Sequence, residues 1–275
     1  MNQYIPVAAK ITDIVKHTDI EWTFRVSCKT DGVLPGKFYE ISIPKFGESP
    51  ISVSGYGNDY IDFTIRNVGK VTSELFKYNI GDNFFIRGPY GNGFDVSLYE
   101  ERDIVVVAGG SGLAPVRGII EYFYNNPNKC KSFKLIAGFR SLEDILFKPD
   151  IKRWSEKLDV LVTVDKADED YNGNVGLVTK YIPNLNIENL DNMSAIVVGP
   201  PMMMKFTVEE FLKRDIAENN IWVSYERKMC CGIGKCGHCK MDDTYICIDG
   251  PVFDYSYAKN LIDYEDTCYD KRFKY

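Results

Sequence analysis

Four cysteines in the last fifth of this 275-residue chain stand at fixed intervals in a glycine-rich stretch. The cysteines of this C-x4-C-x2-C-x7-C pattern are Cys231, Cys236, Cys239 and Cys247. Thiolates are soft ligands that suit iron–sulfur clusters, and the first three spacings match the plant-type arrangement around a 2Fe–2S cluster. Glycines at positions 232, 234 and 237 allow the backbone torsions that a chain needs to pass close around a cluster, with its N–H groups turned to the sulfurs. The pattern therefore predicts a loop wrapped around a 2Fe–2S cluster.

Two other readings of the cysteines stay open at this point. A zinc site is the chief rival, since C-x2-C pairs are common zinc ligands, although the first gap here is four residues and rich in glycine. Disulfides are the weaker alternative, because so dense a run would pair in strained loops. Cys230 adjoins Cys231 but does not fit the spacing, so we interpret it as a bystander thiol. Three isolated cysteines are read as ordinary thiols: Cys28, Cys130 and Cys268.

Composition excludes some classes of function. The 33 basic and 39 acidic residues give a net charge of −6, which argues against binding nucleic acid or an anionic membrane. No apolar run is long enough to span a membrane, and the N-terminus lacks the layout of a signal peptide. We expect a cytoplasmic protein, in which eight cysteines favour ligands over disulfides.

The first third of the chain alternates in short strand-like runs separated by glycine and proline turns, which predicts a small closed β-barrel. The runs are Ala8–Val15, Trp22–Ser27, Phe38–Ile43, Tyr60–Arg66 and Asn83–Arg87, with a short helix over Val71–Tyr78. In the segment Ser49–Ser54 a serine hydroxyl could bond a flavin ring nitrogen. In Arg66–Thr72 a cation, a glycine and a threonine precede a helix start, which suits phosphate. Segments of both kinds also occur commonly in proteins with a purely structural role.

The next part of the chain alternates strands and helices, which predicts a doubly wound parallel sheet. Its expected strands include Asp159–Val164 and Ile221–Tyr225, the latter closing the sheet, and a solvated loop is expected over Lys166–Gly176. The apolar run Asp103–Ala108 leads into Gly109–Pro115 and then a helical segment, the layout in which backbone amides meet a pyrophosphate. A second apolar run, Ala195–Val198, leads into Gly199 and Pro200 and a helix over Lys205–Lys213. Either turn could instead be glycine used for close packing. Because ligands bind at the carboxyl ends of such strands, we expect both turns at one nucleotide site.

The order of these motifs resembles the ferredoxin–NADP reductase superfamily over nearly the whole chain, and within it the subgroup with a C-terminal 2Fe–2S domain. That subgroup includes electron-transfer subunits of dihydroorotate dehydrogenase and hydrogenase gamma subunits. The strongest resemblance is to the B subunits of anaerobic sulfite reductases, carried by GESPISVSGYG, RNVGKVTSELF, VVGPPMMMKFTV and MCCGIGKCGHC. It implies three parts: a FAD-binding β-barrel at 1–98, an NAD(P)-binding α/β domain at 99–225, and a 2Fe–2S domain with the tail at 226–275.

The resemblance also implies which residues bind the cofactors. Those expected around FAD are Pro50, Ile51, Ser52, Val53, Thr64, Ile65, Arg66, Gly69, Val71 and Thr72. Those expected around the nicotinamide dinucleotide are Gly109, Gly110, Gly112, Ala114, Pro115, Gly199, Pro200 and Met203. Many superfamily members carry Arg at the position of Ser49 and an aromatic residue at that of Ile51. Since both are absent here, the pyrophosphate charge would fall to Arg66 and Lys70.

The chemistry implied by the resemblance belongs to the cofactors, so no catalytic side chain is expected. NADH would give a hydride to FAD, and single electrons would leave through the 2Fe–2S cluster to partner subunits. For a sulfite reductase those partners are a ferredoxin-like iron–sulfur subunit and a sirohaem subunit. Arg140 and Ser141 could suit a 2′-phosphate, but Glu143 and Asp144 favour NADH. The alternatives are the electron-transfer subunit of dihydroorotate dehydrogenase or of a hydrogenase and, from another class, a zinc-bearing interaction module.

Overall fold

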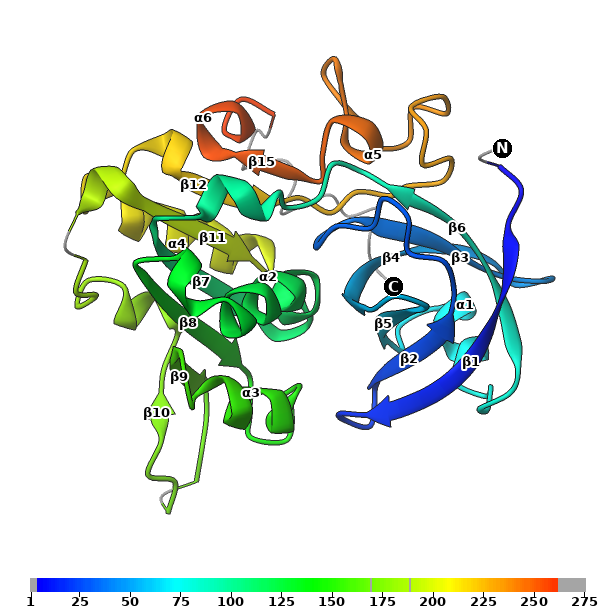
Figure 1. Ribbon diagram of the computed structural model, residues 1–275, viewed down its shortest axis with the longest axis horizontal. Coiled ribbons are helices and arrows are strands. Elements are labelled where there is room, and N and C mark those ends of the chain that lie inside the picture. The colour runs from blue at the N-terminus through cyan, green and yellow to red at the C-terminus, as the bar shows by residue number, and fades with distance from the viewer. Residues whose placement is uncertain (1–3, 169, 188, 262–275) are drawn as a thin grey trace. The chain divides into compact units, whose positions relative to one another are not determined.

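A six-stranded antiparallel barrel forms the first part of the chain in the computed structural model, which describes residues 4–168, 170–187 and 189–261. In Figure 1 its strands run from blue to cyan. The order around the closed barrel is β1-β2-β5-β4-β3-β6. The elements are β1 (Val7–Lys16), β2 (Glu21–Ser27), β3 (Phe38–Ile43), β4 (Gly47–Tyr56), β5 (Tyr60–Arg66), α1 (Lys70–Leu75) and β6 (Asn83–Tyr90). Large apolar side chains from facing strands, including Phe24, Phe63 and Phe84, fill the interior and are fully buried.

A seven-stranded sheet with order β10-β9-β8-β7-β11-β12-β15 forms the second part. Its strands are β7 (Asp103–Gly109), β8 (Ser132–Phe139), β9 (Asp159–Val164), β10 (Asn174–Val175), β11 (Met193–Val198), β12 (Ile221–Ser224) and β15 (Val252–Asp254). The helices are α2 (Leu113–Asn125), α3 (Lys148–Trp154), α4 (Pro201–Leu212) and α6 (Tyr255–Ala258). Every residue of β7 and β11 is buried, as expected of parallel strands covered on both faces. The predicted barrel and parallel sheet are therefore confirmed.

Short elements connect these parts. The 3-10 helices are η1 (Val96–Tyr99), η2 (Gly110–Gly112), η3 (Pro127–Lys129), η4 (Val178–Tyr181), η5 (Leu190–Asn192) and η6 (Glu218–Asn220). The cysteine segment contains the hairpin β13 (Lys240–Met241) and β14 (Thr244–Tyr245), followed by α5 (Ile246–Asp249). None of the helices among the described residues has the length and apolar character needed to cross a membrane.

Three details differ from the sequence expectation. The strand at Ile221 does not close the sheet, because β15 lies beyond β12 at that edge. The two residues of β10 form the opposite edge strand of the sheet, within a stretch that the sequence predicts to be a loop. Helix α4 begins at Pro201 rather than Lys205, since proline is well tolerated in a first helical turn. The predicted isolated thiol Cys268 lies outside the described residues.

The chain packs as two compact units. The barrel as far as Phe94 packs together with Tyr225–Val252, and Asp95–Ser224 packs with the described residues from Phe253 to Leu261. The cysteine segment is thus part of the same compact unit as the barrel. The division into three domains at 98 and 225 stays a prediction.

Candidate functional site

The cysteine loop turns its backbone amides toward two of the predicted ligand sulfurs. The Sγ of Cys231 accepts from the N–H groups of Ile233 at 3.5 Å, Lys235 at 3.3 Å and Cys236 at 3.5 Å. The Sγ of Cys247 accepts from the N–H of Gly234 at 3.3 Å. Gly232 and Gly234 have φ of +74° and +68°, a region that side chains disfavour, and this lets the loop curl around the sulfurs. Such N–H···S contacts stabilise thiolate charge.

The four thiols are arranged as two pairs. The pKa of Cys236 is lowered, first by the backbone of His238 and also by the side chain of Cys231. Burial raises the pKa of Cys247, and a hydrogen bond with the side chain of Cys239 raises it further. Across residues 4–261, leaving aside 169 and 188, no group of three or more His, Cys, Asp or Glu side chains converges so as to hold one metal ion. The loop therefore contains two pairs of thiols, and Cys236 is the one that is exposed to solvent.

The cysteine loop packs on the barrel through strand β6. A Cβ on Gly232 would lie 2.6 Å from the ring of Tyr90, so only glycine fits there. Arg87 is buried and donates to the carbonyl oxygens of Cys230 at 2.5 Å and Cys231 at 2.7 Å. The same guanidinium pairs with the Glu48 carboxylate at 2.6 Å. Sequence reasoning missed these contacts, although an arginine inside the apolar run FFIRGPY is a signal of a buried polar role.

The two predicted glycine turns meet at the carboxyl ends of adjacent parallel strands. Strand β7 pairs with β11 in register, with Ala108 opposite Val198. A Cβ on Gly112 would lie 2.5 Å from the Val198 carbonyl oxygen, and one on Gly109 would lie 2.3 Å from the Met203 sulfur. Gly110 has φ +52° and opens the turn into α2. The structure therefore brings Gly109, Gly112, Gly199, Pro200 and Met203 together. Their role in binding a nucleotide stays a prediction.

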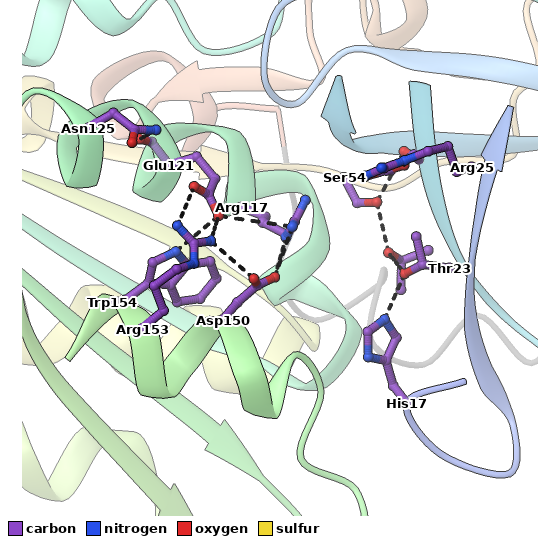
Figure 2. A network of polar contacts seen from close by, with 12 residues as sticks. His17, Thr23, Arg25, Ser54, Arg117, Glu121, Asn125, Asp150, Arg153 and Trp154 are labelled. Carbon is purple, nitrogen blue, oxygen red and sulfur yellow. Dashed lines mark hydrogen bonds and ion pairs between the residues drawn. The ribbon is translucent and has the colours of Figure 1, made fainter. Parts of the chain in front are cut away.

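Helices α2 and α3 are joined by a half-buried ionic network (Figure 2). Arg117 on α2 binds Asp150 on α3 at 2.8 Å, and Arg153 on α3 binds Glu121 on α2. Glu121 also accepts from the indole N–H of Trp154 at 3.1 Å. The loop between β8 and α3 is held at its far end by this network. Within that loop Ser141 donates to the Asp144 carboxylate at 2.8 Å.

The predicted flavin residues fall into two groups. Val53 and Ile65 are core residues of the barrel at 1% exposure, so they can offer only backbone groups outward. Ser52 on β4 and Thr64 on β5 each adjoin a member of the Val53–Phe63 pair of these neighbouring strands, and both are half-buried. Pro50 and Ile51, also half-buried, precede them on β4.

The predicted phosphate-binding segment is largely engaged with itself. The Thr72 hydroxyl accepts from the N–H groups of Val68 at 3.1 Å and Gly69 at 2.9 Å and donates to the Gly69 carbonyl. Val71 packs against the barrel core. Arg66 donates to the buried Glu21 at 2.5 Å, so its charge is already matched. The structure thus gives Arg66 an ion-pair partner that sequence reasoning did not anticipate.

A row of polar side chains crosses the outer face of the barrel next to Thr64. Thr64 donates to Ser54 at 2.8 Å and shares a contact of 2.8 Å with Thr23, which in turn lies 2.7 Å from His17 Nε2. Figure 2 shows His17, Thr23 and Ser54 in this row. Ser54 is fully buried, and its hydroxyl also donates to the Asp62 carbonyl at 3.1 Å. The alternation of polar and apolar residues in β2 and β5 was the signal for this face.

Comparison with known proteins decides the family. The model of an oxidoreductase NAD-binding domain matches residues 106–209. The model of the iron–sulfur cluster binding domain of dihydroorotate dehydrogenase B matches residues 226–258. Sulfhydrogenase 2 subunit gamma of Pyrococcus furiosus is 35% identical, over 93% of this chain and 96% of that one. The electron-transfer subunit of dihydroorotate dehydrogenase B from Clostridium perfringens is 33% identical, over 79% of this chain and 84% of that one.

The chain belongs to the family that contains these sulfhydrogenase gamma subunits and dihydroorotate dehydrogenase electron-transfer subunits. A solved structure of an NADH-dependent reduced ferredoxin–NADP oxidoreductase matches with a TM-score of 0.75 at 24% identity, over 96% of this chain and 97% of that one. A ferredoxin–NADP⁺ reductase from Neisseria gonorrhoeae matches with a TM-score of 0.66 at 19% identity, over 79% and 97%. These likenesses establish a ferredoxin–NADP reductase-like fold. The relatives carry the names held as alternatives in the sequence analysis, hydrogenase gamma and dihydroorotate dehydrogenase subunits, and give the sulfite reductase reading no support.

Proposed function

We propose that this chain is the electron-transfer subunit of a multi-subunit oxidoreductase, taking electrons from NADH through FAD to a 2Fe–2S cluster and on to a partner subunit. The observation that carries the proposal is the cysteine loop, with its amides directed at Cys231 and Cys247. Two pairs of thiols suit a cluster that contains two metal ions, since such a cluster takes four cysteine ligands in all. A single tetrahedral zinc would need all four around one point.

Each part of the chain has a role in this scheme. When bound, FAD accepts a hydride and releases electrons singly to a cluster that carries one at a time. The glycine turns after β7 and β11 pack closely against each other, and the dinucleotide would bind beside them at the α2 N-terminus. Ser52 on β4 would offer its hydroxyl to the flavin, and Thr64 would border the flavin from the neighbouring strand β5. Cys231, Cys236, Cys239 and Cys247 hold the cluster, and the exposed Cys236 marks the edge nearest to solvent.

NADH is favoured over NADPH by the loop after β8. In a doubly wound sheet this loop follows the strand beside β7 and faces the ribose end of the nucleotide. Ser141 is bonded to the Asp144 carboxylate, so the hydroxyl that could meet a 2′-phosphate already faces a negative charge. We therefore expect NADH to reduce the protein faster than NADPH does.

The test uses the whole chain, purified without oxygen and with its cofactors. We expect flavin absorption together with broad iron–sulfur bands, and iron rather than zinc by metal analysis. In the Cys236→Ser and Cys239→Ser variants, NADH should still bleach the flavin, while reduction of an added one-electron acceptor by way of the cluster is lost. Cys130→Ser, at an isolated half-buried thiol, is the matched control and should behave as wild type. Zinc without iron would support the interaction-module alternative instead.

The partner is tested by recovering the chain from its own cells without oxygen. Given the relatives, we expect the co-purifying complex to show NADH-linked hydrogenase activity, and orotate reduction is the next candidate. NADH-linked sulfite reduction by a complex that contains a sirohaem subunit would restore the reading as an anaerobic sulfite reductase subunit.

A further inference from the structure

Arg87 on β6 is a buried cation in direct contact with the backbone of the cysteine loop. Its side chain is 4% exposed. One terminal nitrogen donates to the Cys231 carbonyl at 2.7 Å and to the Tyr90 hydroxyl at 3.1 Å. The other donates to the Cys230 carbonyl at 2.5 Å. The barrel thus places a fixed positive charge against the residue that begins the cysteine pattern.

Glu48 on β4 supplies the opposing charge. Its carboxylate accepts from Arg87 Nε at 3.1 Å and from the second terminal nitrogen at 2.6 Å, a two-point contact. Its side chain is 37% exposed, whereas Arg87 is enclosed. The field of the cation on the loop is therefore offset by a carboxylate that solvent partly screens.

Reduction of an iron–sulfur cluster adds one negative charge, so nearby fixed charges shift its reduction potential. A cation on the ligand backbone favours the reduced form, and a carboxylate disfavours it. The N–H groups that meet Cys231 Sγ belong to the same turn whose carbonyls Arg87 holds. Arg87 consequently fixes both a charge and the orientation of the amides at this sulfur.

We propose that Arg87 and Glu48 are positioning residues of opposite sign that set the reduction potential of the cluster from the barrel. This inference rests on the iron–sulfur site of the proposed function. The reduction potential of the cluster then depends on residues of the barrel as well as on the cysteine loop.

The test is an anaerobic redox titration of the cluster-loaded protein, followed by visible absorption and electron paramagnetic resonance. Arg87→Gln should lower the potential, with about a tenfold loss in the equilibrium constant for one-electron reduction, or about 59 mV. Glu48→Gln should raise the potential by a smaller amount, because that carboxylate is partly exposed. Arg25→Gln is the matched control: Arg25 forms the same two-point pair with Asp62 in the same barrel, and its loss should leave the potential unchanged.

The outcomes separate this inference from the proposed function. A wild-type protein that takes up no iron–sulfur cluster overturns the proposed function. A wild type with its cluster, and unchanged potentials in both variants, overturns only the role of Arg87 and Glu48. Should Arg87→Gln fail to retain its cluster, Glu48→Gln alone decides: a raised potential supports the inference, and an unchanged or lowered one ends it. A purely structural contact would not move the two potentials in opposite directions.

Discussion

At the proposed nucleotide site, Gly112 has no room for a side chain. Its missing Cβ leaves room for the Val198 carbonyl, 2.5 Å from where that atom would stand, and backbone cannot move aside as a side chain can. Gly112→Ala should therefore push the turn after β7 away from β11. We expect the dissociation constant for NADH to rise at least about tenfold, a loss of about 1.4 kcal/mol.

Titration with NADH under anaerobic conditions measures this change. The thermal unfolding midpoint of the variant, recorded in parallel, separates a local shift of the turn from a loss of fold. An unaltered affinity in a folded Gly112→Ala protein would show that the turn does not contact the dinucleotide.

Glu40 is a buried carboxyl group, and its ionisation at high pH disfavours the folded state. It is fully buried on β3, and neither carboxyl oxygen has a hydrogen-bond partner within the described residues. Burial raises its pKa from 4.5 to about 8. The folded state therefore binds a proton that the unfolded state releases between these values, and stability falls as pH rises through this window.

Glu40→Gln should remove that pH dependence, because the amide cannot ionise. The urea unfolding midpoint of the variant, measured near pH 5 and near pH 8, should fall less than that of wild type, each pKa unit being worth about 1.4 kcal/mol. Glu48→Gln provides the contrast. A hydrogen bond from Arg87 lowers the pKa of Glu48. The stability that ionised Glu48 contributes is therefore lost as pH falls, the opposite direction to Glu40. Equal pH profiles for wild type and Glu40→Gln would contradict the assignment.

At the scale of elements, the contact between α2 and α3 depends on Glu121. This carboxylate accepts from Arg153 and from the indole N–H of Trp154, whose side chain is fully buried. Glu121→Ala would leave the indole N–H unpaired, at a cost of about 1–3 kcal/mol. We expect faster hydrogen exchange across α3 and a lower thermal midpoint.

Glu156→Ala is the control for this prediction. Glu156 is an exposed carboxylate just past the end of α3, so its removal should change stability by no more than about 0.5 kcal/mol. Similar exchange rates in the two variants would mean that α3 is held by its apolar contacts and not by the ionic network.

Strong periodicity made most elements predictable from the sequence. Phe38–Ile43, Tyr60–Arg66 and Asp159–Val164 match β3, β5 and β9 residue for residue, since alternation or a buried run fixes a strand locally. The two-residue β10 and three-residue β15 were missed, because so short a segment becomes a strand only by pairing with a distant edge. The glycine turns were predicted with their residues, whereas the Glu21–Arg66 and Arg87–Glu48 pairs join residues 45 and 39 positions apart and leave no local pattern.

At the scale of the molecule, the cysteine loop and the barrel behave as one compact unit. Asn92 joins them: its side chain donates to the carbonyls of Asp249 at 3.0 Å and Val252 at 2.7 Å, and its N–H donates to Gly250 at 2.7 Å. Together with Arg87, these contacts connect residues more than 140 positions apart. The surface on which this loop packs could not be predicted, since nothing local in the sequence reveals it.

We therefore expect that loss of the cluster destabilises the barrel strands that the cysteine loop contacts. Ligand binding and folding are coupled in small metal-binding segments, so an iron-free loop loses order and stops supporting β6. In the Cys239→Ser protein we expect hydrogen exchange to rise about tenfold or more in 225–252 and in β3 and β6. Amides of β7, β8 and β11 should exchange as in wild type, because they belong to the other compact unit.

Comparison with cluster-loaded wild type and with Cys130→Ser, which keeps the cysteine pattern intact, completes the experiment. Faster exchange confined to 225–252 would mean that the barrel is independent of the loop. Faster exchange spread equally through the parallel sheet would mean that the variant is globally destabilised. Only a rise shared by the loop and its barrel strands fits a cluster whose binding energy supports the barrel through Arg87 and Asn92.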